Sequence, residues 1–500
     1  MIFNFLKPQG NELEELNIKF SADLLAKRAV FGILVLAVRR IGLQLIQTFS
    51  TIILARILFP EVFGVFTIMV FFVDFLAFLP SQGFVSAIIQ KKERISSKDI
   101  STIFWTIISL SFLMLGIFWL STPYIINFYK GGVTMDTLLI RLTGLAILLV
   151  NLRLISFAIL ERQLKYMRLT IIELGETVVI QIIAVFMAFR GFGVESLVVG
   201  YLVGKSFGAL AAYFFGPIKA ILNFSTKALK RLLAFAVHYQ IYSFTNMVSG
   251  AIAPIYVGRI IGTTGVGYLT WAGGLGLAPW AFAELVGRVI FPVLSRSQKN
   301  KAFFVLALDK AIELSFMVTL PFFTLIFVFA TPITVIVYTA KWLPAIWALR
   351  FYVLLGLTAS ISTVAASALL ALGQVKYVRN VSLISAITFW VLSLILVPKF
   401  GFSAQPLAWF LGSTIQLALV VKIVGTTRVK YWDKLVIYLL ASIISVISVF
   451  SSMGQIESIF KLTISILLAL LIYGLLIWIF RRNHILFYLR QLKVVPKNSI

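Results

Sequence analysis

Apolar stretches of about twenty residues recur along the whole chain and are separated by short polar segments. That is the length an α-helix needs to cross roughly 30 Å of hydrocarbon. A transmembrane β-barrel would instead show segments of about ten residues with alternating polarity, which this sequence lacks. The pattern predicts an all-α polytopic membrane protein with about fourteen transmembrane helices. The predicted spans are 30–54, 62–80, 101–120, 138–160, 170–189, 194–216, 233–257, 265–287, 311–330, 346–372, 377–397, 402–421, 436–452 and 462–480.

The composition leaves little room for a water-soluble domain. Hydrophobic residues make up 60% and charged residues 12% of the 500 residues, and the mean hydropathy is +1.02. Soluble domains are usually roughly 45–50% apolar, so lipid must be the main solvent. A net charge of +26 would suggest nucleic acid as the partner of a soluble protein, but most Lys and Arg residues lie in short loops between apolar spans. That placement indicates membrane topology, and we expect no nucleic-acid partner.

The distribution of positive charge predicts that both termini are cytoplasmic. One set of alternate loops holds most of the 44 Lys and Arg residues, and cytoplasmic loops of membrane proteins carry such an excess. Residues 1–29 have mixed charge and no cleavable apolar segment, so we expect a cytoplasmic N-terminal segment and no signal peptide. The opposite loops carry only Arg56, Lys130, Arg190, Arg259, Lys341, Lys399 and Lys461.

The first twelve spans contain an internal repeat. Gly64 in ARILFPEVFGVFTI recurs as Gly267 in GRIIGTTGVGYLTW, and Gln163 in RQLKYMR recurs as Gln374 in GQVKYVR. Because six spans is an even number, the two copies are parallel and related by an axis along the membrane normal. The predicted organisation is a cytoplasmic N-terminal segment over 1–29, an N-lobe of helices 1–6 over 30–218, a cytoplasmic linker over 219–232, a C-lobe of helices 7–12 over 233–425, and helices 13–14 with a basic cytoplasmic tail over 426–500.

Enzyme signatures are scarce. The chain has two histidines and no cysteine, which excludes disulfides and thiolate metal sites. It contains no HExxH motif, no Walker A loop and no dinucleotide fingerprint. The glycines within 258–276 are better explained by close helix packing than by a phosphate-binding loop. We therefore expect no catalytic residue, no metal site and no cofactor other than a coupling ion.

The informative residues are ionisable side chains inside the predicted spans. Each costs roughly 2.5–3.5 kcal/mol near a helix centre on insertion scales, so each implies a partner or water. The acids Asp74, Glu173 and Glu176 either bind and release H⁺ or Na⁺ or pair with nearby arginines. Arg141 and Arg350 lie near span ends, where snorkelling to the interface is an alternative. The cations that would suit an anionic substrate are Arg40, Arg39, Arg153, Lys205, Arg141 and Arg350.

Two polar stripes occupy equivalent helices of the repeat. Their residues recur at helical spacing, which places each stripe on one helix face. Two such faces turned inward would line a shared aqueous cavity from both lobes. The alternative is interhelical hydrogen bonding with no substrate. The stripe residues are Arg40, Gln44, Gln47 and Thr51 in the first span and His238, Tyr242, Thr245 and Ser249 in the seventh.

Five segments carry a family resemblance. They are LARILFPEVFGVFTI, QGFVSAIIQKKE, LERQLKYMRL, GFGVESLVVG and KWLPAIWALRF, in this order. Their order and spacing resemble the bacterial polysaccharide transporters, the Wzx-like oligosaccharide flippases of the multidrug/oligosaccharidyl-lipid/polysaccharide exporter superfamily. The resemblance covers roughly residues 30–425. Phe59 and Glu195 depart from the family pattern, which commonly has Gly before Pro-Glu and Trp at these places.

The resemblance implies two six-helix lobes, two extra C-terminal helices, and a flippase. Its substrate would be undecaprenyl-pyrophosphate-linked oligosaccharide, moved by alternating access across the bacterial inner membrane for surface polysaccharide assembly. Buried cations suit a pyrophosphate, and amide and hydroxyl side chains suit sugar hydroxyls. We expect a monomer that works beside the glycosyltransferases and polymerase of its pathway.

Two other functions stay open at this point. An ion-coupled multidrug exporter of the same superfamily would favour acidic or aromatic groups, whereas arginines are in excess inside the spans. A membrane glycosyltransferase, polymerase or ligase would usually place catalytic residues in a sizeable external loop, and the predicted external loops are short.

Overall fold

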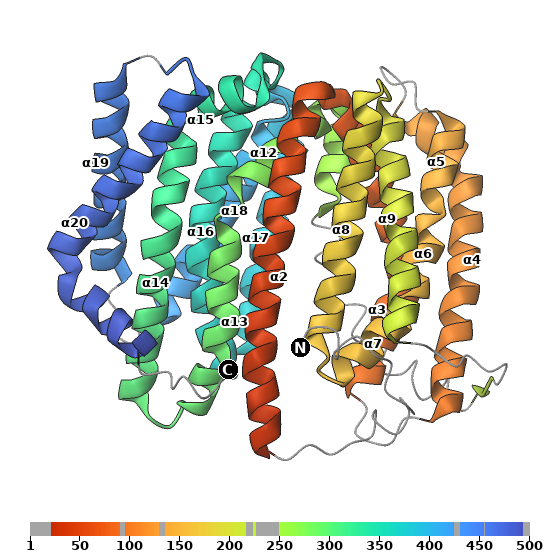
Figure 1. The fold of residues 1–500 in the computed structure, drawn as a ribbon, viewed down its shortest axis with the longest axis horizontal. Coiled ribbons are helices and arrows are strands. Elements are labelled where there is room, and N and C mark those ends of the chain that lie inside the picture. The colour runs from red at the N-terminus through yellow and green to blue at the C-terminus, as the bar shows by residue number, and fades with distance from the viewer. Residues whose placement is uncertain are drawn as a thin grey trace. The chain divides into compact units, whose positions relative to one another are not determined.

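The computed structural model describes residues 22–90, 96–129, 136–216, 224–226, 250–424, 431–454 and 456–493. Within these ranges the regular structure is helical, with no strand. The chain divides into two compact units, Met1–Thr270 and Trp271–Ile500, called here the first and second unit. Figure 1 shows long helices in each unit.

The helices of the first unit follow the predicted spans closely. The predicted fourth span, 138–160, is interrupted near Leu145 and Arg153 and forms three short helices. The predicted seventh span, 233–257, lies largely outside the described residues. The helices are α2 (Ala22–Ile57), α3 (Pro60–Gln90), α4 (Ser97–Phe128), α5 (Thr137–Gly144), α6 (Ala146–Leu152), α7 (Leu154–Arg162), α8 (Tyr166–Phe189), α9 (Val194–Phe215), the π-helix η2 (Ile252–Val257), α11 (Gly258–Ile260) and α12 (Thr263–Gly276), whose last residues belong to the second unit.

The second unit is also helical, and one of its predicted spans is broken. The predicted eighth span, 265–287, is not one helix, because α12 ends at Gly276 and the next helix begins at Trp280, directly after Pro279. Proline suits a helix start, where its missing N–H would have no helical partner. The helices are α13 (Trp280–Arg296), α14 (Lys301–Val328), α15 (Ala330–Pro332), η3 (Ile333–Tyr338), η4 (Ala340–Ala345), α16 (Ile346–Ala371), α17 (Val375–Phe400), α18 (Ala404–Val424), α19 (Tyr431–Met453) and α20 (Ile459–Lys493).

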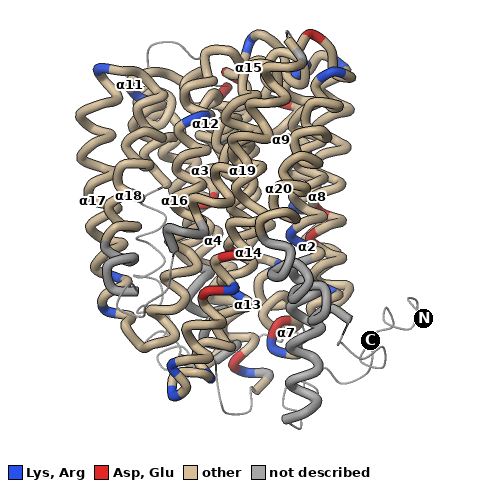
Figure 2. Tube along the Cα trace, turned by 90° about the vertical axis from the view of Figure 1, so that its left-hand side faces the viewer, with Lys and Arg blue, Asp and Glu red and all other residues tan. Residues whose placement is uncertain are grey.

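The described helices confirm the predicted class. Ten of them are long and apolar enough to cross a membrane, or eleven if the bent pair α12 and α13 forms one span. Figure 2 shows that most charged residues of the described chain lie toward the helix ends, with a minority between them. The protein is therefore a multi-pass helical membrane protein, as the apolar pattern predicts.

Local sequence explains where several helices begin. Ser96 and Asp99 form a capping box at the start of α4, because the Ser96 hydroxyl accepts from the Asp99 N–H at 3.2 Å and the Asp99 carboxylate accepts from the Ser96 N–H at 3.1 Å. Asn300 caps α14 by accepting from the N–H of Phe303 at 3.1 Å. These caps satisfy N–H groups that have no partner within the helix.

The turns before α8 and α17 share one hydrogen-bond pattern. The N–H of Lys165 donates to the carbonyl of Leu160 at 2.9 Å, and the N–H of Gln374 donates to that of Leu369 at 3.0 Å. The residue before each donor is left-handed: Leu164 has a φ of 56°. Its counterpart Gly373 has a φ of 77°. Such turns normally use glycine, so Leu164 carries strain that its counterpart avoids. The two turns place Lys165 opposite Gln374, a register that differs by two residues from that of the sequence motif, which pairs Gln163 with Gln374.

Helices α3 and α12 touch backbone to backbone at the two repeat-equivalent glycines. A Cβ atom at Gly64 would lie 1.8 Å from the carbonyl oxygen of Thr263. A Cβ atom at Gly267 would lie 1.8 Å from the carbonyl oxygen of Pro60. Only glycine permits this approach, in the manner of small-residue contacts between membrane helices.

A threonine pair extends the same crossing. The hydroxyls of Thr67 and Thr270 lie 3.1 Å apart, and the two residues are 203 positions apart in sequence. That spacing also separates Gly64 from Gly267. The crossing therefore joins equivalent positions, as in an isologous dimer contact. We call the contact of these two glycines and two threonines the glycine crossing.

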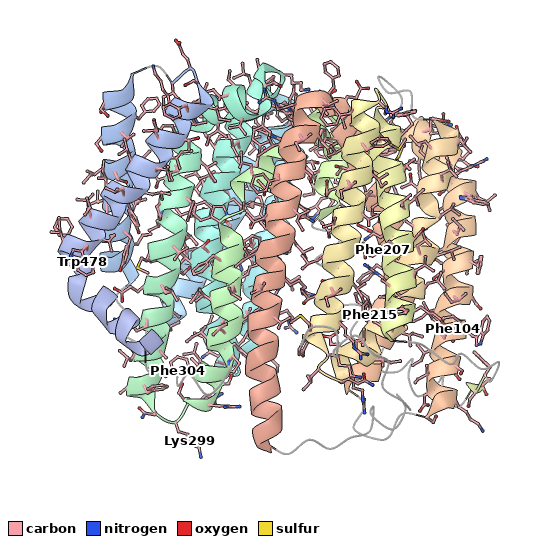
Figure 3. All side chains as sticks on the ribbon, viewed as in Figure 1. Phe104, Phe207, Phe215, Lys299, Phe304 and Trp478 are labelled. Atoms are coloured by element: carbon pink, nitrogen blue, oxygen red, sulfur yellow. The ribbon has the colours of Figure 1, made fainter. Side chains whose placement is uncertain are left out.

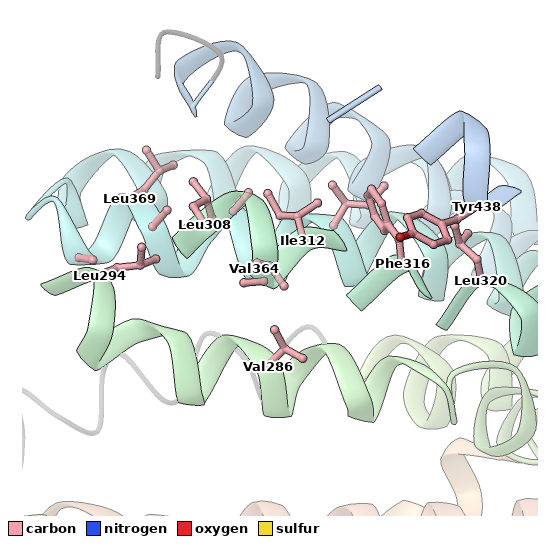
Figure 4. Packing of buried hydrophobic residues seen from close by; sticks show 14 of the residues in the cluster. Val286, Leu294, Leu308, Ile312, Phe316, Leu320, Val364, Leu369 and Tyr438 are labelled. Carbon is pink, nitrogen blue, oxygen red and sulfur yellow. The ribbon is translucent and has the colours of Figure 1, made fainter. Parts of the chain in front are cut away.

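A hydrophobic core of the second unit lies among α13, α14, α16, α17, α19 and α20 (Figure 4). Leu308, Ile312 and Phe316 of α14 are 1% exposed or less and pack with side chains of the neighbouring helices. Deletion of such a side chain to alanine typically costs about 2–5 kcal/mol. α19 and α20, the two helices outside the repeat, are thus an integral part of this unit.

Candidate functional site

Two acids on α8 form the centre of a charged cluster in the first unit. Glu173 and Glu176 are three residues apart, so they share one side of the helix. Nη1 of Arg39, on α2, donates to Oε2 of Glu173 at 2.6 Å. The Arg39 and Glu173 side chains are 24% and 28% exposed. This ion pair links α2, the first predicted span, to α8, the fifth.

Glu176 is held by two cations at once. Nζ of Lys205, on α9, donates to Oε1 at 2.8 Å, and Nη1 of Arg153 donates to Oε2. Arg153 lies at the break between α6 and α7, which carries its side chain out of the regular helix. The three side chains are only 15% (Arg153), 6% (Glu176) and 16% (Lys205) exposed. This triad of Arg153, Glu176 and Lys205 is called here the cation clamp.

Gly208 on α9 makes room for the cation clamp. A Cβ atom there would lie 2.3 Å from Oε2 of Glu176 and 3.3 Å from Nη1 of Arg153. The face of α9 that contacts α8 carries small residues at one-turn intervals, Gly200, Gly204 and Gly208. Figure 3 labels two large side chains of the same helix, Phe207 and Phe215. The four-residue spacing of these glycines is visible in the sequence, but this contact was not predicted from it.

Asp74 and Tyr201 extend the cluster toward α3. The Tyr201 hydroxyl donates to Oδ1 of Asp74 at 3.5 Å, a long hydrogen bond. Tyr201 is buried, whereas Asp74 is exposed on its helix. The Lys205 ammonium lies 5.1 Å from the centre of the Tyr201 ring, which is a cation–π distance. A carboxylate within a membrane-spanning helix needs a partner or water, and the Tyr201 hydroxyl is such a partner.

The cluster lies deep in the membrane-spanning part of the unit. Glu176 is roughly 15 Å along α8 from Tyr166, and Lys205 roughly 17 Å along α9 from Val194. Its six ionisable side chains comprise three cations and three acids. Such charges inside a membrane are expensive unless paired or hydrated, so pairing is the expected resting arrangement. The six are Arg39, Arg153, Lys205, Asp74, Glu173 and Glu176.

The structure thus brings together residues that the sequence analysis assigned to two separate roles. Arg39, Arg153 and Lys205 were predicted as substrate cations, and the acids as ion-coupling groups. Pairing with nearby arginines was one of the two alternatives stated for the acids, and Glu173 and Glu176 do pair with these cations. Their roles in binding and coupling stay predictions.

The polar stripe of the first span lies on α2 and is partly exposed. Arg40 and Gln47 are exposed on α2, Gln44 and Thr51 are half-buried, and Gln44 donates to Thr48 at 3.5 Å. Their lining of a cavity stays a prediction. The four stripe residues of the seventh span, His238, Tyr242, Thr245 and Ser249, lie outside the described residues.

Arg141 and Arg350 lie on α5 and α16. Arg141 is exposed, and its carbonyl accepts from the Trp119 indole N–H at 2.9 Å. The Arg350 guanidinium, in the second unit, lies 5.1 Å from the Trp347 ring centre and 5.6 Å from that of Phe327, which are cation–π distances. Snorkelling of the two arginines and their binding of substrate both stay predictions.

One buried acid of the second unit was not predicted from the sequence. Glu313 on α14 is fully buried and accepts from the Tyr438 hydroxyl of α19 at 3.0 Å and from Nζ of Lys310 at 3.2 Å. A second polar contact between these helices joins the hydroxyls of Thr324 and Ser442 at 3.0 Å. These contacts dock α19 on α14. Glu313 fell close to the boundary of the predicted ninth span, so its depth was not evident.

The geometry defines a membrane protein that can bind anions or cations but offers no catalytic constellation in its described part. No group of three or more His, Cys, Asp or Glu side chains there could hold a metal ion. Arg153 and Lys205 can each grip a phosphate oxygen, and the acids can each take a proton or a small cation. These binding properties suit a transporter.

Comparison with known proteins gives the family. Residues 53–347 match the family described as "Polysaccharide biosynthesis protein". The chain belongs to this family, and the resemblance noted in the sequence is confirmed. It is 24% identical over 347 residues to "Lipopolysaccharide biosynthesis protein WzxC" of Escherichia coli (strain K12), covering 67% of this chain and 68% of that protein. It is also 24% identical over 345 residues to "Uncharacterized membrane protein in cps region" of Klebsiella pneumoniae, covering 68% and 70%.

Solved structures share the fold. "Lipid II flippase MurJ, inward closed conformation" has a TM-score of 0.76 at 19% identity and covers 90% of this chain and 99% of its own. An inward-facing multidrug resistance transporter of the MATE family has a TM-score of 0.60 at 16% identity, covering 78% and 96%. The chain therefore shares its fold with these two solved structures.

Proposed function

We propose that this protein is a flippase that moves undecaprenyl-pyrophosphate-linked oligosaccharide units from the cytoplasmic to the outer leaflet. The product would feed surface polysaccharide assembly, whether O-antigen, capsule, exopolysaccharide or teichuronic acid. Family membership supports this proposal, as do relatives whose names refer to lipopolysaccharide, succinoglycan and teichuronic acid biosynthesis. The observation that carries it is a pair of cations, Arg153 and Lys205, held deep among membrane-spanning helices.

The transport cycle follows from the chemistry of the substrate. The polyprenyl tail stays in lipid, while the pyrophosphate and the sugars need a polar path that is open to one side at a time. Arg153 and Lys205 supply charge-assisted donors for phosphate oxygens, and Arg40 with Gln44, Gln47 and Thr51 offers further donors along α2. No covalent step is required, because the substrate leaves unchanged.

Coupling to an ion gradient would use the acids of the cluster. Asp74, Glu173 and Glu176 are each able to take up H⁺ or Na⁺, and each is costly in the membrane without a compensating role. We assign the protein to the bacterial inner membrane with both termini cytoplasmic, on the excess of Lys and Arg in one set of loops. Its partners would be the lipid-linked substrate, membrane lipid, and the glycosyltransferases and polymerase of its pathway, with the transporter itself a monomer.

An ion-coupled multidrug exporter is the second candidate. It is favoured by the three acids of the cluster and by the MATE transporters that share the fold. A cationic drug would replace a cation beside Glu176, whereas a pyrophosphate would replace the carboxylate itself. Loss of Arg153 or Lys205 should therefore impair transport of a pyrophosphate substrate and not that of a cationic drug.

The test is complementation of a strain that lacks its own flippase, with surface polysaccharide and protein level both measured. Arg153→Ala and Lys205→Ala should abolish most polysaccharide at normal protein abundance, while Arg190→Ala, at an exposed loop position, should complement fully. Lipid-linked oligosaccharide should accumulate in the two inactive strains. Full complementation by both cluster variants would refute the assignment of the site.

A further inference from the structure

The carboxylate of Glu176 occupies the two cations that the proposed function assigns to the substrate pyrophosphate. Oε1 lies 2.8 Å from Nζ of Lys205, and Oε2 accepts from Nη1 of Arg153. We propose that Glu176 is an internal competitor of the substrate, so that its carboxylate must leave Arg153 and Lys205 before a phosphate group binds there. The inference rests on the proposed function and deepens it by stating how the site is kept closed.

Competition follows from the chemistry of the two anions. Carboxylates and phosphates are recognised by the same charge-assisted hydrogen bonds from lysine and arginine. With Glu176 in place, the three charges of the cation clamp sum to a single positive charge, and exposed Asp74 lies beside them. A phosphate added to this group would meet the Glu176 carboxylate at contact distance in surroundings that screen charge poorly. Exchange is therefore favoured over simultaneous binding.

Loss of the negative charge of Glu176 should consequently favour phosphate binding. The groups around the Glu176 carboxylate are Arg153 from the α6–α7 break and Lys205 from α9, with Glu173 of α8 one turn away. Tyr201 of α9 and Asp74 of α3 complete the surroundings on the side of Lys205, and Arg39 of α2 pairs with Glu173. Without the Glu176 charge the two cations are released, so Glu176→Gln should raise phosphate affinity.

Gly208 offers a way to open the cation clamp without removing a charge. In Gly208→Ala the new Cβ would lie 2.3 Å from Oε2 of Glu176, which is the end of a flexible side chain and can move away. The carboxylate then leaves Arg153 while every ionisable group is retained. Gly116→Ala is a matched control, because a Cβ at Gly116 meets nothing within 4 Å.

The experiment measures binding of inorganic pyrophosphate to the purified full chain in lipid nanodiscs by calorimetry at pH 7.5. Glu176→Gln and Gly208→Ala should bind about tenfold tighter or more than wild type, because a site open in a tenth of molecules or fewer loses affinity by that fraction. Gly116→Ala should bind like wild type.

The outcomes separate the two proposals. If Glu176→Gln or Gly208→Ala is folded by thermal melting yet binds no tighter than wild type, the competition is wrong while the phosphate site stands. If Glu176→Gln fails to fold, Gly208→Ala decides alone. If no variant binds pyrophosphate, or if Lys205→Ala binds as well as wild type, the phosphate site of the proposed function is wrong as well.

Discussion

Alanine at Gly64 should disrupt the glycine crossing between α3 and α12. The added Cβ would lie 1.8 Å from the carbonyl oxygen of Thr263, where an ordinary contact begins at 3.4 Å. The obstacle is backbone, so the helices themselves must separate by roughly 1.5 Å at this point. The same argument holds for Gly267→Ala against the carbonyl of Pro60.

The size of the effect can be worked from these contacts. Overpacking of a close helix contact typically costs about 1–3 kcal/mol, and backbone contacts lie at the upper end. Separation also breaks the Thr67–Thr270 hydrogen bond, worth about 0.5–1.5 kcal/mol. Each single variant should therefore lose about 2–4 kcal/mol, which lowers the unfolding midpoint of a unit of this size by about 5 °C.

A double-mutant cycle gives the sharper test. Once α3 and α12 have separated to accept one Cβ, the second finds room, so the double variant should lose clearly less than the sum of the two singles. Unfolding midpoints in detergent would be measured for the four proteins, with Gly274→Ala as the control on α12, where a Cβ meets nothing within 4 Å. Strict additivity, or a midpoint for Gly64→Ala equal to that of Gly274→Ala, would refute the crossing.

Two further predictions concern a turn and the topology. Leu164→Gly should be more stable than Leu164→Ala by about 0.5–1 kcal/mol, since glycine adopts the left-handed φ of 56° without strain; an equal or lower melting midpoint for glycine would contradict this. Because the chain has no native cysteine, a single cysteine at exposed Arg190 should react with an impermeant maleimide in intact cells, and one at exposed Lys299 (labelled in Figure 3) should react only after lysis. Labelling of the Lys299 position in intact cells would reverse the topology.

The sequence alone determined the class of protein and the course of most helices. A span in lipid requires about twenty apolar residues, and every backbone N–H and C=O must find its hydrogen-bond partner within the helix. The local sequence therefore determines where each span lies. The predicted span 346–372 coincides almost to the residue with α16, and the predicted span 170–189 ends with α8 but begins four residues after it. The repeat was visible too, since Gly64 and Gly267 stand in matching segments, and the costly charges were recognisable one by one.

Tertiary structure decided which of these residues meet. Helical periodicity gives the face of a residue on its own helix, but the partner depends on how helices far apart in sequence pack. Arg39 and Glu173 are 134 positions apart, and Arg153 reaches Glu176 only because the fourth span breaks at that residue. The contact of Gly64 with the backbone of Thr263, the space that Gly208 leaves for a carboxylate, and the burial of Glu313 against Tyr438 were equally hidden. Insertion into lipid depends on each span separately, whereas pairing of charges depends on side-chain distances that only the packed bundle fixes.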